Sequence, residues 1–265
     1  MYNLVPTRWF RRVARKMLKK TGYKLVRTPH DETPLVWRRG KCSYFTLHYC
    51  LQTVKSAGLS IRSVLDIGAN GAQWSKEVKW FFPEAHFYLI EPQIEMEGAL
   101  RAFCESAVHA KYFLAGAGPQ SGETTLTVWE DLQGSSLLPQ ASEELIAEGR
   151  QRKIPIVAIN DLIQRGDIPI PELCKIDIQG YELKALEGAQ LLFGKTEMFI
   201  LEVSLFGFLP ETPSVYDVVF YMHQKGYVLY DMPGFGHRPL DGALGQIDMC
   251  FVKEDSVLRK SHQWN

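Results

Sequence analysis

Long apolar runs are missing from this sequence of 265 residues. A helix needs about 18 consecutive apolar residues to span a bilayer, so we predict no transmembrane helix. Cysteine is also scarce, with five residues that are widely spaced and form no C-x-x-C pair. This spacing argues against a zinc site and against a disulfide framework. Cys174 and Cys250 lie inside apolar runs, which predicts buried thiols and a reducing, cytoplasmic location.

The sequence also has no net charge, because 30 Lys and Arg residues balance 30 Asp and Glu residues. The balance is uneven, since residues 1–30 hold nine basic residues and no acidic one, which leaves 21 basic against 30 acidic residues beyond them. Within residues 6–20, apolar side chains recur at helical spacing and Lys and Arg fill the other face, which predicts an amphipathic basic helix. Such a helix either lies on an anionic membrane, here the inner face of the cell membrane, or packs on the domain. We expect no nucleic-acid partner, and the sequence leaves the oligomeric state open.

Short apolar runs alternate with helical patterns after a helix predicted over residues 44–58. Strands are predicted at residues 63–67, 86–92, 111–118, 122–130, 154–159, 172–178, 197–203, 227–232 and 247–252. Helices are predicted at residues 73–82, 93–106, 142–150, 160–166, 181–193 and 214–226. This alternation is typical of an α/β fold with a doubly wound, mostly parallel sheet. We therefore expect a helical extension over residues 1–59, one domain over residues 60–255 and a tail over residues 256–265.

The stretch SVLDIGANGAQWSKEV, residues 63–78, places an acid and two glycines where a strand passes into a helix. Ligands of open α/β sheets bind at the carboxyl ends of the strands, and glycine lets a ligand approach the backbone. Asp66 would repel a pyrophosphate but suits a cationic ligand without phosphate, such as S-adenosylmethionine. Glu91 ends the second strand 23 residues after Gly68, near the spacing at which an acid binds ribose hydroxyls. Either acid alone could instead be a turn cap or a solvated strand end.

Six segments, VLDIGANGAQWS, LIEP, IPIVAINDLI, KIDIQGYELKALEGA, FILEVS and GQIDMCFV, resemble in this order the FkbM-type S-adenosylmethionine-dependent methyltransferases, over roughly residues 60–253. The resemblance implies the class I methyltransferase (Rossmann-like) sheet with an antiparallel last strand. It also implies S-adenosylmethionine as cofactor and O-methylation of a hydroxyl, often on a sugar of a surface polysaccharide or natural product. The acceptor would then be a small molecule or a glycan. The candidate cofactor-binding residues are Asp66, Gly68, Asn70, Gly71, Glu91 and Gly116.

Two positions depart from the family pattern. The family usually carries glycine at the position of Ala72, whereas here the glycine is Gly71. The residue after the third strand is often polar and contacts the adenine, but here the segment offers only Ala115, Gly116 and Ala117. We therefore expect the adenine and carboxypropyl contacts to differ from the usual ones.

Methyl transfer to a hydroxyl is helped by a base that takes the hydroxyl proton. Asp177 is the first candidate because it ends the fourth core strand, and the resemblance supports a functional cluster with Gln179 and Glu182. Glu182 could alternatively serve only as a partner of its helix dipole. Glu202 at the end of the fifth strand and His237 in a glycine-rich loop are further candidates. Two acids alone are too common a pattern to predict a metal, so we predict none.

A nicotinamide-dependent sugar oxidoreductase or epimerase is the rival class. Tyr221 and Lys225 have the Y-x-x-x-K spacing of short-chain dehydrogenases. The glycine turn, however, lacks the G-x-x-x-G-x-G pattern of those enzymes, and Asp66 stands where a phosphate would lie. We therefore prefer the methyltransferase.

Overall fold

The structure is a computed structural model that describes residues 23–27, 34–38, 45–130 and 132–263. The basic segment over residues 6–20 lies outside these ranges, so the amphipathic helix expected there stays a prediction. Within the described ranges, no helix is long and apolar enough to cross a membrane.

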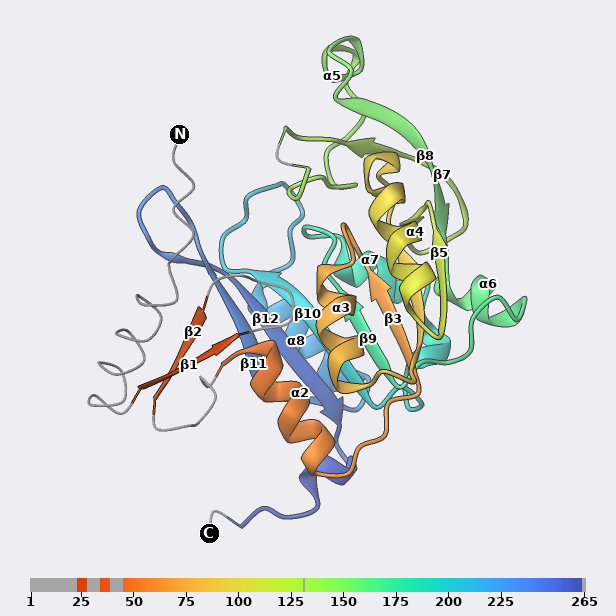
Figure 1. The fold of residues 1–265 in the computed structure, drawn as a ribbon. Coiled ribbons are helices and arrows are strands. Elements are labelled where there is room, and N and C mark those ends of the chain that lie inside the picture. Colours follow the sequence, from red (N-terminus) through yellow and green to blue (C-terminus); the bar gives the residue numbers. More distant parts are fainter. Residues whose placement is uncertain (1–22, 28–33, 39–44, 131, 264–265) are drawn as a thin grey trace, which may run out of the picture.

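A seven-stranded sheet forms the centre of the molecule (Figure 1). Its strands lie in the order β11-β12-β10-β9-β3-β4-β5. They are β3 (Ser63–Ile67), β4 (His86–Ile90), β5 (His109–Phe113), β9 (Leu173–Ile176), β10 (Met198–Ser204), β11 (Tyr227–His237) and β12 (Leu244–Lys253). Strand β12 runs antiparallel to both neighbours, and the remaining pairs are parallel. This is the class I methyltransferase arrangement that the resemblance implied.

Helices cover both faces of this sheet, as the alternating pattern predicted (Figure 1). On one face lie α2 (Leu47–Ser56), α3 (Gln73–Phe81) and α4 (Glu97–Ser106). On the other lie α6 (Ile159–Gln164), α7 (Glu182–Glu187) and α8 (Val215–Gln224). Each buries an apolar stripe against the strands, and two hydrophobic clusters result, one on each side of the sheet. The described residues also form the short 3₁₀ helices η1 (Ile94–Met96), η2 (Gln190–Leu192) and η3 (Val257–Arg259).

Local sequence explains where these helices begin. Thr46 accepts a hydrogen bond from the backbone of Tyr49 at the start of α2, and Ser214 and Asp217 form a reciprocal capping box at the start of α8. Helix α2 buries Cys50, Leu51 and Val54 and contacts α3 and β11. It therefore packs on the sheet, although we placed it in the N-terminal extension.

Three predicted strands lie partly or wholly outside the main sheet. The strand predicted at residues 111–118 belongs to the main sheet only as far as Phe113. Its last part, β6 (Gly116–Ala117), forms a separate sheet with β7 (Gly122–Thr127) and β8 (Gln151–Val157), in the order β6-β8-β7. This sheet and α5 (Glu143–Ala147) lie above the carboxyl ends of the central strands (Figure 1). Residues 233–237, expected as a loop, belong to β11. In the segment expected to be helical, β1 (Tyr23–Arg27) and β2 (Pro34–Arg38) pair antiparallel.

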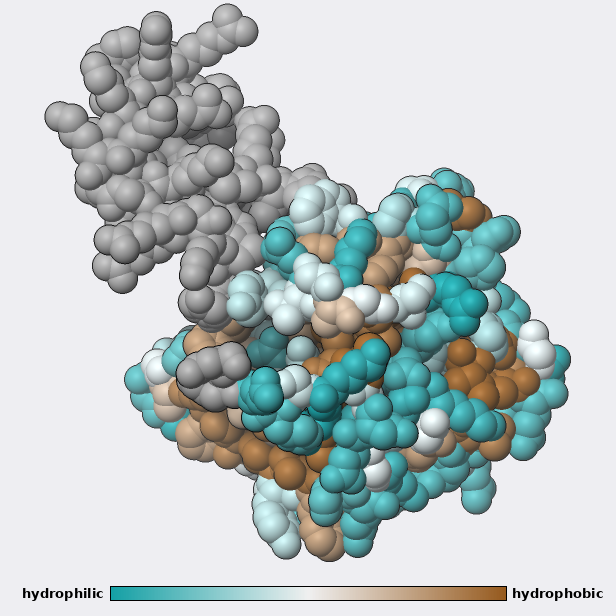
Figure 2. Space-filling view, turned by 90° about the horizontal axis from the view of Figure 1, so that it is seen from below, coloured by the Kyte–Doolittle hydropathy of each residue, from teal (hydrophilic) through white to brown (hydrophobic). Residues whose placement is uncertain are grey.

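The opposite end of the molecule, where the parallel strands begin, presents a mixed surface. Figure 2 views the molecule from this end and shows hydrophilic residues between separate hydrophobic areas. The cavities described below lie at the other end, beside the small sheet.

Candidate active site

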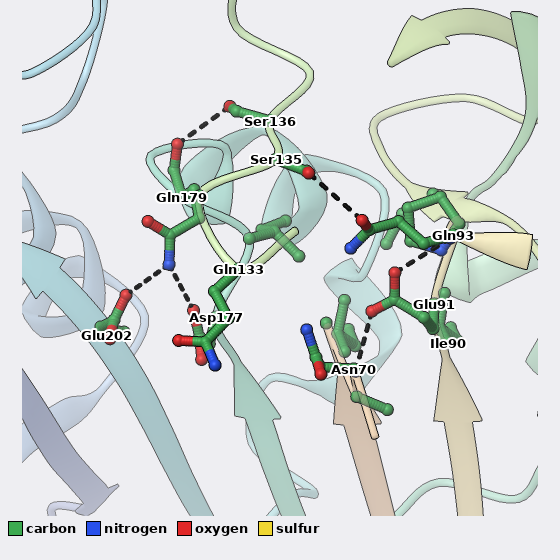
Figure 3. A pocket seen from close by; sticks show the side chains of 18 of the residues that line it. Asn70, Ile90, Glu91, Gln93, Gln133, Ser135, Ser136, Asp177, Gln179 and Glu202 are labelled. Carbon is green, nitrogen blue, oxygen red and sulfur yellow. Dashed lines mark hydrogen bonds between the residues drawn. The ribbon is translucent and has the colours of Figure 1, made fainter. Parts of the chain in front are cut away.

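A cavity of about 600 Å³ opens at the carboxyl ends of the central strands. Its wall combines the turns after β3, β4 and β9 with the small sheet and the loop over residues 133–137. A cavity of this volume holds a ligand the size of a nucleoside cofactor. Figure 3 shows two polar groups on opposite sides of it: Asn70, Glu91 and Gln93 on one, and Asp177, Gln179 and Glu202 on the other.

Glu91 anchors the first polar group. Its side chain is buried, and each carboxylate oxygen accepts one backbone hydrogen bond, from Asn70 N at 2.8 Å and from Gln93 N at 3.0 Å. Burial raises the pKa of Glu91, and these hydrogen bonds oppose the rise. Because a carboxylate oxygen can accept more than one hydrogen bond, Glu91 keeps acceptor capacity for a ligand in the cavity.

The glycine turn shapes the floor of the cavity. Gly68 has φ +76°, and a Cβ there would lie 1.8 Å from the backbone oxygen of Asp177, so only glycine fits. Asn70 and Ala72 also have left-handed φ values, of 45° and 60°. Ala72 thus occupies a conformation that glycine prefers, which gives a physical reason for glycine at this position in the family.

Lys175, which the sequence analysis missed, links the two sides of the site. Its ammonium lies 3.1 Å from Asp177 Oδ2, 3.5 Å from Asp66 Oδ1 and 3.1 Å from the carbonyl oxygen of Gly68. Burial raises the pKa of Asp177, but Lys175 and hydrogen bonds from Glu202 and Gln179 outweigh it and hold that pKa below its ordinary value. Asp177 is therefore ionised at neutral pH.

Glu202 behaves in the opposite way. Burial, followed by the negative charge of Asp177, raises the pKa of Glu202 to about 9. The amide of Gln179 donates to both acids, to Asp177 Oδ1 at 3.0 Å and to Glu202 Oε2 at 2.8 Å, and Gln246 donates to Glu202 Oε2 at 2.8 Å. The two neighbouring acids thus hold one proton between them, which resides on Glu202.

Glu182 stabilises the turn that carries Asp177 and Gln179. One carboxylate oxygen of Glu182 accepts hydrogen bonds from Ile178 N at 3.1 Å and Gly180 N at 3.0 Å. Burial raises the pKa of Glu182 to about 7. Gln179 itself has φ 55°, an uncommon conformation for a residue other than glycine. Glu182 therefore acts on the site through the shape of this turn.

The wall of the cavity contains seven of the predicted site residues, namely Gly68, Asn70, Glu91, Gly116, Asp177, Gln179 and Glu202. The structure does not bring the other four into this wall. Asp66 is fully buried and accepts a hydrogen bond from Ser75 Oγ at 2.6 Å, on the α3 side of the sheet. The side chain of Asn70 caps Gly71 N, Glu182 lies beneath the turn, and His237 lines a second cavity.

Sequence reasoning also missed polar residues that β12 and the loop after β7 contribute. Gln246 comes from β12, and Ser135 lies in the loop after β7, where its hydroxyl donates to Gln93 Oε1 at 3.2 Å. The indole nitrogen of Trp74, another wall residue, is buried without a hydrogen-bond partner among the described residues. Lys175 could have been singled out from the sequence, because it is a charged residue inside an apolar strand, two residues before Asp177.

The residues that favoured an oxidoreductase lie elsewhere. Tyr221 and Lys225 both contact Gln190, at 3.1 Å and 2.7 Å, and neither lines the cavity. Among the described residues, no group of three or more His, Cys, Asp or Glu could hold a metal ion.

Comparison with protein families matches residues 66–229, more than half of the chain, to the methyltransferase FkbM domain. The solved structures with a similar fold include methyltransferase FkbM from Methylobacillus flagellatus KT, with 18% identity over 74% of this chain and a TM-score of 0.47. The chain spans 47% of that protein. Precorrin-6y C5,15-methyltransferase from Geobacter metallireducens GS-15 has 14% identity over 77% of this chain and 86% of its own, with a TM-score of 0.43. No curated protein matches the chain.

Proposed function

The chain belongs to the FkbM methyltransferase family, and on that premise we propose that it transfers a methyl group from S-adenosylmethionine to a hydroxyl of a sugar or glycan. One observation carries this proposal. A single cavity places the buried carboxylate of Glu91 on one side and the ionised carboxylate of Asp177 on the other. The first suits a ribose and the second suits a hydroxyl that must lose its proton.

The residues of the cavity fit S-adenosylmethionine. Glu91 would accept hydrogen bonds from the ribose hydroxyls, and Gly68 lets the backbone approach the ligand without a Cβ. The side chain of Trp74 also belongs to this wall, and its indole N–H is buried without a hydrogen-bond partner among the described residues. When bound, the cofactor supplies a methyl group on a positively charged sulfur, which makes that group open to attack by oxygen.

Asp177 is the group that would remove the proton of the acceptor. Its carboxylate is held by Lys175 on Oδ2 and by Gln179 on Oδ1, so its orientation is fixed before the acceptor arrives. Asp177 would accept the hydroxyl proton and so make the acceptor oxygen a better nucleophile. Glu202, already protonated, would hold Gln179 in place and would not compete for that proton.

Isothermal titration calorimetry with S-adenosylhomocysteine and NAD tests the cofactor. We expect binding of S-adenosylhomocysteine and none of NAD. Glu91→Ala should weaken binding by roughly 10- to 100-fold, because a hydrogen-bonded charged group contributes about 1.5–3 kcal/mol. Glu105→Ala is the matched control, since Glu105 is exposed on α4 and outside the cavity. Equal affinity of both variants, or tighter binding of NAD, would contradict the proposal.

A further inference from the structure

A second cavity of about 380 Å³ adjoins the first. Four residues, Gly134, Gln179, Pro239 and Gln246, line both, so the two cavities meet beside the carboxyl pair. The remaining wall comes from the segment after β7, the end of β10 with the loop after it, and the β11–β12 hairpin. Glu91 lines only the first cavity, and the second cavity reaches Asp177 and Glu202 through the shared Gln179, which donates to both acids.

Aromatic and uncharged polar side chains make up most of this wall. Trp129 and Phe208 provide apolar surface, and Ser204, Thr212 and the shared Gln179 and Gln246 provide hydroxyl and amide groups; Phe208 is 52% exposed. Among the described residues that line the second cavity, none is Asp, Glu or Lys. Such a wall offers hydrogen bonds in both directions and a flat apolar surface, without a carboxylate or an ammonium group.

The two basic side chains of this wall are already engaged. Arg238 donates to both carboxylate oxygens of Asp241, at 2.7 Å and 2.6 Å, and its guanidinium lies 3.9 Å from the ring centroid of Phe206. His237 Nδ1 lies 3.1 Å from the carbonyl oxygen of Gly242 and donates to it. Both basic side chains of this wall therefore already have a partner among the described residues, which makes the wall a poor site for a phosphate or a carboxylate.

We propose that the second cavity binds the methyl acceptor and that this acceptor is an uncharged ring with hydroxyl groups, which packs its apolar face against Trp129 and Phe208. The amide and hydroxyl groups of the wall bind the ring hydroxyls, and one hydroxyl passes Gln179 to reach Asp177. This inference rests on the proposed function, since it needs a methyl donor in the first cavity. It adds to that function the cavity through which the acceptor enters and the prediction that the acceptor is uncharged.

Tryptophan indole N–H resonances provide a test that needs no knowledge of the natural acceptor. The full chain, labelled with ¹⁵N-tryptophan, is saturated with S-adenosylhomocysteine and titrated with three neutral probes, the methyl pyranosides of glucose, mannose and galactose. Trp74 lines the first cavity, Trp129 lines the second, and Trp80 is exposed on α3 outside both. Trp74→Phe, Trp80→Phe and Trp129→Phe assign the three resonances.

We expect the Trp74 resonance to respond to S-adenosylhomocysteine, the Trp129 resonance to respond to at least one pyranoside, and the Trp80 resonance to respond to neither. Phe208→Ala should weaken pyranoside binding roughly 2- to 10-fold, as expected for loss of one aromatic contact. Phe220→Ala, an equally exposed aromatic residue on α8, should leave it unchanged. Methyl glucuronide, in which a carboxylate replaces the C6 hydroxymethyl group of the glucoside, should bind more weakly.

The outcomes separate the two proposals. A Trp74 resonance that S-adenosylhomocysteine does not shift would contradict the proposed function. A responsive Trp74 with a Trp129 resonance that none of the three pyranosides shifts would overturn the acceptor site alone. Tighter binding of methyl glucuronide than of methyl glucoside would overturn the inference that the acceptor is uncharged.

Discussion

Lys175 Nζ lies 3.1 Å from Asp177 Oδ2 and also forms an ion pair with Asp66 Oδ1, at 3.5 Å, on the neighbouring strand β3. The same ammonium donates to the carbonyl oxygen of Gly68 at 3.1 Å. One buried cation therefore joins the turn that shapes the cofactor cavity to the acid at its other side. This arrangement couples the charge state of Asp177 to the position of the glycine turn.

Lys175→Met should raise the pKa of Asp177 and destabilise the fold. The substitution leaves two carboxyl groups without their cation, and breaking a buried ion pair in this way costs about 3–5 kcal/mol. A titration of the Asp177 carboxyl ¹³C shift would follow the pKa, and urea unfolding would follow the stability. Lys175→Arg, which keeps the charge, is the control. An unchanged midpoint for the Asp177 titration in the methionine variant would show that Lys175 does not set it.

Asp177→Asn and Glu202→Gln make the same chemical change in two neighbouring acids and should differ in effect. Asp177 is ionised, so its amide variant loses the base, which is typically worth roughly 10²–10⁴-fold in rate. Glu202 is protonated at neutral pH, so an amide resembles its native form and should change kcat only a few-fold. The kcat with a methylated acceptor and the Kd for S-adenosylhomocysteine measure the two effects. A larger loss in Glu202→Gln would move the base to Glu202.

The sheet and the three acids at its edge could be predicted because they depend on local signals. Apolar runs of strand length that alternate with amphipathic helices define a parallel sheet, and Glu91, Asp177 and Glu202 follow or end such runs. The carboxyl ends of parallel strands meet at one edge, so the acids were expected to lie near one another. The cavity wall contains all three.

The remaining parts of the site depend on pairing between distant segments, which periodicity does not specify. The segments at residues 122–130 and 154–159 look like strands, but nothing in their pattern says that they pair with each other rather than with the main sheet. Gln246 reaches Glu202 only because β12 pairs with β10 in one register. The sequence predicts Asp66 as a ligand contact, because sequence position does not show that its side chain lies against α3.

Stability should fall as the pH rises from about 4.5 to about 9. The pKa of Glu202 is raised from 4.5 to about 9, and burial also raises the pKa of Glu182 to about 7 and that of Asp248 to about 6. In that window the folded chain holds protons that the unfolded chain releases, so each such group lowers the free energy of unfolding by up to about 1.4 kcal/mol per pH unit. Chemical denaturation at a series of pH values measures the slope. Glu202→Gln should flatten it, and an equally steep slope in that variant would contradict the shifted pKa.

Gly68→Ala and Gly71→Ala should separate a required glycine from a tolerated one in the same turn. At Gly68 a Cβ would lie 1.8 Å from the backbone oxygen of Asp177, in a left-handed conformation that costs about 1–2 kcal/mol. Overpacking adds about 1–3 kcal/mol, so the total of about 2–5 kcal/mol should lower the melting temperature by several degrees.

Gly71 lacks this constraint, because the nearest atom to an added Cβ is the side-chain nitrogen of Gln73 at 3.8 Å. Gly71→Ala should therefore change stability by less than about 0.5 kcal/mol, the range expected where no packing or backbone feature is lost. Differential scanning fluorimetry of both variants beside the parent chain measures the difference. In Gly68→Ala, the Asp177 backbone must also shift to admit the methyl group, so we expect weaker S-adenosylhomocysteine binding together with the loss of stability. Similar melting temperatures for the two variants would mean that the turn can move away from Asp177, and the close contact between Gly68 and Asp177 would then not be what requires glycine at this position.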